Sequence, residues 1–290
     1  MQWKWPKDRS DPSSKALVVT RNQVNMLNRC HLIKIYKILS PVFVVVIAWK
    51  CLSWLLLLLK GVIFPAPEDV AREFVGYLQG SPIFGHSLAG QTLATIKRWL
   101  LGYLLGTLTG LVVGLLCAIS EWLAMAFYPV ILMLQMVPGL AWIPVAILVV
   151  GIGPETSIFM IALATLPPVT IGLMEGIRGV PPEYLYVSRM CGDTAFRRFF
   201  MTQLPSALPS VMTGMRLALA NSWRVVVAAE MVVGTGVGLG YVILQSRWDM
   251  NYEAAFVCIG VIVFLGIVTE RWGFGHLEKY TVKRWGMLNE

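Results

Sequence analysis

Charged side chains are scarce in this sequence of 290 residues. Asp, Glu, Lys and Arg together make up 14% of it, against roughly 25% in an ordinary soluble domain, whereas hydrophobic residues make up 57%. The mean hydropathy is +0.67. So few charges cannot cover the surface of a water-soluble protein, and the apolar residues fall in blocks long enough to cross a bilayer. The sequence therefore predicts one integral membrane domain, surrounded by lipid and without a nucleic-acid partner.

Motifs for metal binding, disulfides and catalysis are lacking as well. The five cysteines follow neither a CxxC nor a Cys/His spacing, so neither a metal site nor a disulfide framework is expected. His31, His86 and His276 lie near or outside the ends of the apolar blocks, and no Ser/His or paired-Asp motif lies within one block. An intramembrane enzyme is therefore disfavoured, and we assign no catalytic residue.

Six apolar blocks are long enough to span a bilayer as helices, at about 1.5 Å of rise per residue. They cover residues 38–59, 92–119, 123–150, 157–174, 211–233 and 254–272. Pro138-Gly139 and Pro144 interrupt the third block, which predicts a kinked or discontinuous helix. Residues 64–78, between the first two blocks, place apolar side chains at helical spacing among charged ones. That pattern is typical of a short surface helix.

Lysine and arginine are distributed unevenly around these blocks. Cytoplasmic flanks of membrane spans carry the excess of positive charge. Segment 1–37, the loop at 178–198 and the end of the chain are rich in both residues. We therefore expect both termini and the loop between spans four and five in the cytoplasm. The predicted fold is all-α, a six-span membrane domain at 38–274 with a basic segment at 1–37 and a tail at 275–290.

Two glycine patterns stand out. Gly102, Gly106, Gly110 and Gly114 recur every four residues in the second block and form one smooth stripe on a helix. Such a stripe lets another backbone approach closely, which predicts a packed bundle, with a glycine track lining a solute path as the alternative. The run at 234–240 lacks the Gly-Lys-Ser/Thr ending of a phosphate loop. We expect a hinge or re-entrant turn there and no nucleotide on this chain.

The predicted cytoplasmic loop, residues 179–209, has the features of two short helices folded about a glycine. Pro182 and Glu183 suit the first turn of a helix. The N–H that proline lacks would have no partner within the helix there, and a carboxylate is favoured at the positive end of the helix dipole. Gly192 can adopt a positive φ and end that helix. The loop is thus expected to be structured.

The second helix of the loop is predicted at 195–203. Asp193 or Thr194 can cap its first turn, and Leu204-Pro205 is expected to end it. The loop also carries arginines that either contact a partner or mark the cytoplasmic side. They are Arg189, Arg197 and Arg198.

The spacing from Gly192 through nine residues to Thr202-Gln203-Leu204-Pro205 resembles the cytoplasmic "EAA" loop of binding-protein-dependent ABC importer permeases. Further likeness lies at 138–144, 151–153 and 222–230, which together resemble the nitrate, taurine, alkanesulfonate and bicarbonate branch. The resemblance covers about residues 64–285. The positions aligned with Glu-Ala-Ala are 186–188, Tyr-Val-Ser, so the acid of the motif is missing.

This resemblance implies a permease subunit that forms the path for a small solute, an anion such as nitrate, a sulfonate or bicarbonate. Two permease chains would pair, two cytoplasmic ATP-binding subunits would dock on the loops, and an extracytoplasmic solute-binding protein would deliver the solute. ATP and Mg²⁺ would bind to the partner subunits, with no cofactor on this chain. The loop residues expected to couple to the ATPase are Glu183, Arg189, Gly192, Asp193, Arg197, Arg198, Leu204 and Pro205.

Polar side chains inside spans are costly and usually face protein or water. The candidates for the translocation path are Gln135, Arg216, Asn221, Arg224 and Glu230. Arg224 and Glu230 are about a third of a turn apart and need not face one another. The arginines can equally bond carbonyls or a neighbouring helix. An ATP-independent transporter or channel is the alternative function, against which the structured loop argues.

Overall fold

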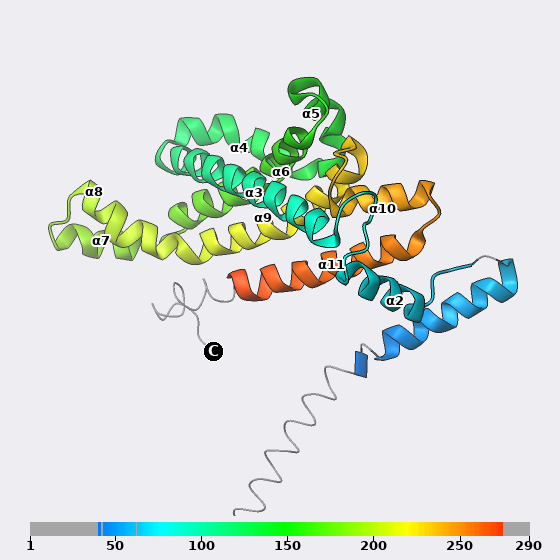
Figure 1. The fold of residues 1–290 in the computed structure, drawn as a ribbon. Helices are drawn as coiled ribbons and strands as arrows, with labels where there is room; N and C mark the ends of the chain where they lie inside the picture. The colour runs from blue at the N-terminus through cyan, green and yellow to red at the C-terminus, as the bar shows by residue number, and fades with distance from the viewer. Residues whose placement is uncertain (1–39, 42, 62, 275–290) are drawn as a thin grey trace, which may run out of the picture. The chain divides into compact units, whose positions relative to one another are not determined.

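The computed structural model describes residues 40–41, 43–61 and 63–274, which are helical apart from loops and one isolated β-bridge between Ile83 and His86 (Figure 1). The chain divides into two compact units, residues 1–68 and 69–290. The predicted basic segment at 1–37 and the tail at 275–290 lie outside the described residues. Both stay predictions.

The first unit contains the helix Phe43–Lys60, which is long and apolar enough to cross a membrane. The segment that follows this helix runs back beside it. Trp49 Nε1 donates to the carbonyl of Pro65 at 3.0 Å. Ser53 Oγ donates to the carbonyl of Phe64 at 2.7 Å. Lys50, the one charge within this predicted span, forms an ion pair with Glu68.

The second unit begins in helix α2 (Pro67–Leu78), the surface helix that the sequence predicted. Its Tyr77 is buried with Ile83 and Leu88 in a cluster that α10 and α11 complete. This cluster anchors the surface helix to the bundle.

Three long helices form the centre of the second unit: α3 (Leu88–Ile119), α6 (Pro154–Arg178) and α9 (Leu204–Val233). Helix α6 packs against both of the others (Figure 1). The glycine stripe of α3 faces α6. A Cβ on Gly106 would lie 2.5 Å from the carbonyl oxygen of Ala162, and one on Gly114 2.9 Å from that of Thr170. Only glycine permits this approach of the two backbones.

Another face of α6 meets α9, which also touches α3, through a second glycine contact that the sequence reasoning did not identify. A Cβ on Gly172 would lie 2.9 Å from the carbonyl oxygen of Ser210, and one on Gly214 2.5 Å from that of Pro168. Gly176 belongs to the same contact, because a Cβ there would lie 2.9 Å from the carbonyl oxygen of Ala207. Two glycines four residues apart do not show which helix they face. The contact appears only once the helices are placed side by side.

The third apolar block is discontinuous, as predicted. It forms α4 (Glu121–Met136), the 3₁₀ turn η1 (Gly139–Trp142) and α5 (Ile143–Val150), with a bend of 107° between the two parts. The break falls at Pro138, which provides no N–H to continue the helix. Such a pair is either a broken span or a re-entrant loop.

The predicted loop contains α7 (Pro182–Met190), α8 (Ala195–Arg198) and the π-helical turn η2 (Phe199–Gln203). Gly192 has φ +79°, and the Thr194 hydroxyl caps α8. The prediction that Leu204-Pro205 ends the second helix is wrong. The N–H of Leu204 donates to the carbonyl of Phe199, five residues back, and α9 follows at once. This wider π-helical turn accommodates the ring of Pro205, so the helix continues from α8 through η2 into α9 without interruption.

The glycine run after α9 makes the turn that the sequence predicted. Gly234 ends α9 in the left-handed conformation, and Gly238 precedes α10 (Leu239–Trp248). A Cβ on Gly238 would lie 2.5 Å from the carboxylate of Glu230, so this position requires glycine. Helix α11 (Tyr252–Val268) and the π-helical turn η3 (Thr269–Phe274) complete the unit.

By length and composition, four described helices can cross a membrane: Phe43–Lys60, α3, α6 and Tyr252–Arg271. The bent pair of α4 with η1 and α5 makes a fifth candidate. Helix α9, the predicted fifth span, is not among them. It is 30 residues long but carries Arg216, Arg224 and Glu230, which lower its hydropathy. The helical membrane fold is confirmed for the described residues.

Candidate functional site

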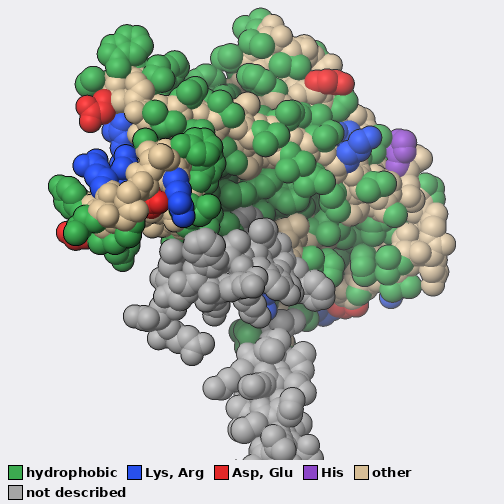
Figure 2. Space-filling model, turned by 90° about the vertical axis from the view of Figure 1, so that its left-hand side faces the viewer, with side chains coloured by type: hydrophobic (Ala, Val, Ile, Leu, Met, Phe, Trp, Pro, Cys, Tyr) green, Lys and Arg blue, Asp and Glu red, His purple; other side chains and the backbone are tan. Residues whose placement is uncertain are grey.

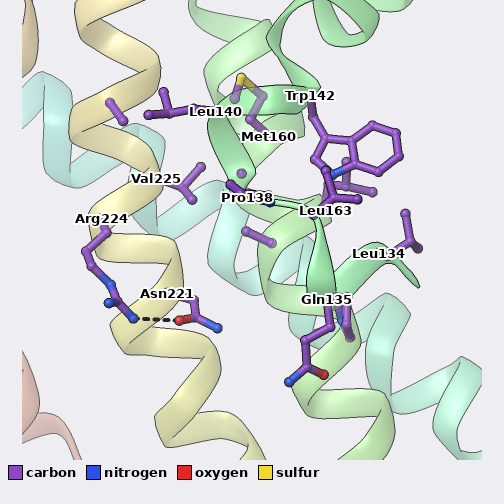
Figure 3. Close-up of a pocket in the computed structure, with 15 residues that line it drawn as sticks. Leu134, Gln135, Pro138, Leu140, Trp142, Met160, Leu163, Asn221, Arg224 and Val225 are labelled. Atoms are coloured by element: carbon purple, nitrogen blue, oxygen red, sulfur yellow. Dashed lines mark hydrogen bonds between the residues drawn. The ribbon is translucent and has the colours of Figure 1, made fainter. Parts of the chain in front are cut away.

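A cavity of about 380 Å³ lies at the break between α4 and α5, with α6 and α9 as its other walls (Figure 3). Gly139 brings the break close to α9, because a Cβ there would lie 2.6 Å from Cγ2 of Val225. Irregular backbone at membrane depth is tolerated where it is buried in protein or lines a cavity. The broken helix and the cavity therefore belong to one feature.

Arg224 is the one charged side chain among the fifteen described residues that line this cavity. Its Nε donates to the carbonyl of Ala220 at 3.1 Å, and its Nη2 donates to Oδ1 of Asn221 at 2.7 Å. These two bonds use two of the five N–H donors of a guanidinium. The guanidinium is thus held in place, and within the described part of the chain three of its donors have no hydrogen bond.

Gln135, near the end of α4, lines the cavity and also a second hollow of about 350 Å³. The second hollow lies between α6 and α9 and is bordered by Glu175, Ser210 and Thr213. Glu175 is close to the end of α6 that leads to α7. Through Gln135, polar lining continues from the broken helix toward the loop.

The structure brings Gln135, Asn221 and Arg224 together but places Arg216 elsewhere. Arg216 is half exposed, and its Nη2 lies 3.1 Å from Oε1 of Glu270 on η3. It lines neither hollow.

Glu230 also lies apart from both hollows, in a closed hydrogen-bond network. The side chain is fully buried. Its Oε1 is 2.6 Å from Nη1 of Arg98, and its Oε2 accepts from Thr95 Oγ1 at 2.9 Å and from the N–H of Gly240 at 3.0 Å. Arg98 also donates to the carbonyl of Val237 at 2.6 Å.

The same network extends along α3 and holds the start of α10. Gln91 Oε1 accepts from the N–H of Gly238 at 2.6 Å, and Thr95 Oγ1 accepts from the N–H of Leu239 at 2.9 Å. The first N–H groups of a helix have no partner within that helix, so these side chains satisfy them. Sequence reasoning missed Arg98 here. An arginine inside an apolar block implies a buried partner, but the sequence does not say which acid supplies it.

The loop residues form a surface of exposed apolar and basic side chains at the α7–α8 end of the second unit (Figure 2). Asp193 accepts from Ser188 Oγ at 2.8 Å and pairs with Arg197 at 3.1 Å, which fixes the turn after Gly192. The guanidinium of Arg189 lies 6.0 Å from the ring centre of Tyr186. Exposed apolar side chains surround these groups, among them Tyr184, Tyr186, Val187, Met190, Phe196 and Phe200.

Comparison with known proteins adds the decisive observation. The family described as binding-protein-dependent transport system inner membrane component matches residues 110–279. This range is more than half of the chain and contains the cavity and the loop. The chain belongs to this family.

Individual relatives agree with the family assignment. The bicarbonate transport system permease protein CmpB of Synechocystis is 30% identical over 83% of this chain and 88% of its own length. The nitrate import permease protein NrtB of Synechocystis is 28% identical over 88% of this chain and 92% of its own. A solved structure of the MetNI methionine ABC transporter has a TM-score of 0.57 at 18% identity, covering 67% of this chain and 95% of that one. The structural likeness shows a shared fold.

The match to the inner membrane component family separates the two polar sites of the chain. Gln135, Asn221 and Arg224 lie inside the matched range, as does the whole loop. Arg98 and Thr95, which hold Glu230, lie before it. The network around Glu230 therefore joins a helix that begins outside the family match to one that lies inside it.

Proposed function

We propose that this member of the family is the channel-forming permease subunit of an ATP-driven importer whose solute is a small anion such as nitrate, bicarbonate or a sulfonate. The observation that supports an anionic solute is Arg224, the one charged side chain among the described residues that line the cavity. A guanidinium in hydrocarbon costs about 2.5 to 3.5 kcal/mol on insertion scales, which an anion in the path offsets. The likeness to permeases named for bicarbonate and nitrate supports this class.

The proposal includes six crossings, with both termini in the cytoplasm and α9 as the fifth span. Thirty residues of helix reach about 45 Å, more than the hydrocarbon thickness. The charges on α9 do not argue against a span, because Glu230 is neutralised by Arg98 and Arg224 faces the cavity. Arg216 pairs with Glu270 beside the end of α11.

The loop is the proposed coupling site for two cytoplasmic ATP-binding subunits, which would hold the ATP and Mg²⁺. Helix α8, η2 and α9 are continuous, so a push on α8 passes along one rod to Arg224 without a flexible joint. Tyr186 and Val187 stand where the motif has its acid, and both are exposed. Apolar contacts and the arginines Arg189, Arg197 and Arg198 would therefore replace an acidic contact.

A second copy of this chain is proposed to complete the path, and a solute-binding protein to deliver the solute from outside. Arg224 and Gln135 are both exposed in the single chain. If this face of the chain met lipid, the positive charge of Arg224 would be strongly unfavourable. Pairing of two copies across this face would place both side chains inside a shared path.

The test is reconstitution of the permease with ATP-binding subunits and a binding protein in liposomes. We expect uptake of nitrate or bicarbonate that requires ATP, stimulation of ATPase activity by the loaded binding protein, and two permease chains by mass measurement. Anion uptake that persists without ATP and without the ATP-binding subunits would instead establish the alternative, an ATP-independent transporter or channel.

A further inference from the structure

The cavity at the broken helix and the second hollow follow the same faces of α6 and α9. Residues three or four positions apart lie on one face of a helix. On α9 the lining residues with this spacing are Ser210, Gly214, Leu217, Asn221, Arg224 and Ala228. On α6 they are Met160, Ala164, Pro167, Ile171 and Glu175. Gln135 of α4 lines both hollows, and Figure 3 shows it with Asn221 at the end of the cavity away from Leu140. The two hollows therefore form one groove along α6 and α9.

This groove runs from the broken helix to the loop. Arg224 lies at its broken-helix end. Glu175 lies close to the end of α6, from which the chain enters the loop, and Ser210 lies near the start of α9, where the chain leaves the loop. Ser210 and Arg224 are 14 positions apart, which corresponds to about 21 Å along a helix. The groove is thus long enough to follow much of the membrane thickness.

The groove carries charges of opposite sign at its two ends. Glu175 is the one charged side chain among the described residues that line the second hollow, as Arg224 is in the cavity. The Glu175 side chain is exposed, and its Oε1 accepts from the hydroxyl of Tyr128 at 3.4 Å. It forms no ion pair within the described part of the chain. Arg178, one turn further along α6, donates to the carbonyl of Cys117 at 2.8 Å.

A carboxylate beside an anion path repels the solute. In a water-exposed site, one unit charge at about 4 Å changes the affinity for a like-charged solute by about fivefold. Glutamine at position 175 would fill the same volume and accept the same bond from Tyr128 without this repulsion. The negative charge of Glu175 therefore lowers the affinity for an anion at the loop end of the groove, while Arg224 raises it at the other end.

We propose that Glu175 determines the release of the anion at the loop end of the groove. This rests on the proposed function, in which the loop lies in the cytoplasm. An anion that Arg224 attracts from the outer side meets a low-affinity exit beside Glu175. An anion on the cytoplasmic side rarely enters the groove, so it competes little with import. Glu175 acts on the solute through its charge.

The substitution that tests this is Glu175→Gln. The permease is reconstituted with ATP-binding subunits in liposomes that contain ATP and increasing concentrations of sodium nitrate, and the loaded binding protein is added outside. We expect the internal nitrate concentration that halves the initial rate of ATP-dependent nitrate uptake to fall about fivefold. Glu175→Asp keeps the charge and should match the unsubstituted complex. Tyr128→Phe removes the hydrogen bond, keeps the charge and should also match it.

Glu121→Gln is the matched control for the loss of one negative charge. Glu121 is exposed at the start of α4 and lines neither hollow. It lies four residues after Cys117, whose carbonyl meets Arg178, so it belongs to the same end of the bundle as Glu175. The inhibition by internal nitrate in this variant should equal that of the unsubstituted complex.

The salt dependence provides a second measurement, because it identifies an electrostatic cause. Raising sodium gluconate on both sides from about 0.01 M to about 1 M shortens the Debye length from about 30 Å to about 3 Å. The difference between Glu175→Gln and the unsubstituted complex should shrink accordingly. A difference that does not change with ionic strength would contradict an effect of charge.

The outcomes separate the two proposals. If the unsubstituted complex imports neither nitrate nor bicarbonate, the anionic solute of the proposed function is wrong, and the role of Glu175 falls with it. If the complex imports them and Glu175→Gln leaves the inhibition by internal nitrate unchanged, or Glu121→Gln strengthens it equally, Glu175 does not determine release although the proposed function stands.

Discussion

Nη1 of Arg98 lies 2.6 Å from Oε1 of Glu230, although the two residues are 132 positions apart in the sequence. The arginine side chain is 11% exposed and the carboxylate 0%. The pair joins α3 to α9. Its remaining hydrogen bonds, together with the bond from the N–H of Leu239 to Thr95, hold the start of α10. An ion pair satisfied so completely fixes three elements in one arrangement.

We predict that Arg98→Leu lowers the free energy of unfolding by about 3 to 5 kcal/mol, because it leaves a buried carboxylate without its counter-charge. Thermal unfolding of the detergent-solubilised permease measures this. Arg72→Leu is the control, since Arg72 is 81% exposed and an exposed pair contributes at most about 1 kcal/mol. The double substitution with Glu230→Leu should recover part of the loss. An Arg98→Leu protein as stable as the original would show that the pair is not structural.

Gly106→Ala is predicted to disturb the contact between α3 and α6. The new Cβ would lie 2.5 Å from the carbonyl oxygen of Ala162, so the two backbones must separate. Gly260→Ala on α11 is the matched control, because no atom lies within 4 Å of its Cβ. Alanine in an open helical position stabilises by up to about 1 kcal/mol. Equal yield and melting temperature for both variants would contradict the close packing.

Gly192→Val should leave the bundle folded and weaken association with the ATP-binding subunits. Gly192 has φ +79°, which a β-branched side chain rarely adopts, so α7 and α8 would change their relative orientation. Co-purification of ATP-binding subunits measures the effect. Gly85→Val carries a similar strain at φ +83° but lies before α3, away from the loop, and should retain association. Undiminished co-purification with Gly192→Val would exclude the coupling role of this turn.

Arg224→Ala and Arg216→Ala should differ in their effect on transport. Arg224 lines the cavity, whereas Arg216 forms a half-exposed pair with Glu270. We expect Arg224→Ala to reduce anion uptake at least tenfold with normal assembly, and Arg216→Ala to change it less than threefold. Uptake assays, with complex yield as the control, decide this. A larger loss of uptake for Arg216→Ala would indicate that the anion path runs past Arg216, near η3.

The membrane fold was predictable because its signals are local. Blocks of apolar residues, the Pro138-Gly139 break and the positive φ of Gly192 follow from residue type and short spacing. The cavity lining was partly predictable for the same reason, since Gln135, Asn221 and Arg224 are polar residues in apolar blocks. The end of the loop's second helix was not predictable. The π-helical turn η2 lets the helix continue past Pro205, and only the backbone geometry of α8, η2 and α9 shows this.

What the sequence by itself determined was the class of protein, the helices and which polar residues needed a partner. Which partner each one has was decided by the tertiary structure. Glu230 meets Arg98 rather than the path, Arg216 meets Glu270, and Arg224 meets the cavity, because each position depends on how distant helices pack. Close glycine contacts set that packing, and they bring together groups that no sequence spacing relates.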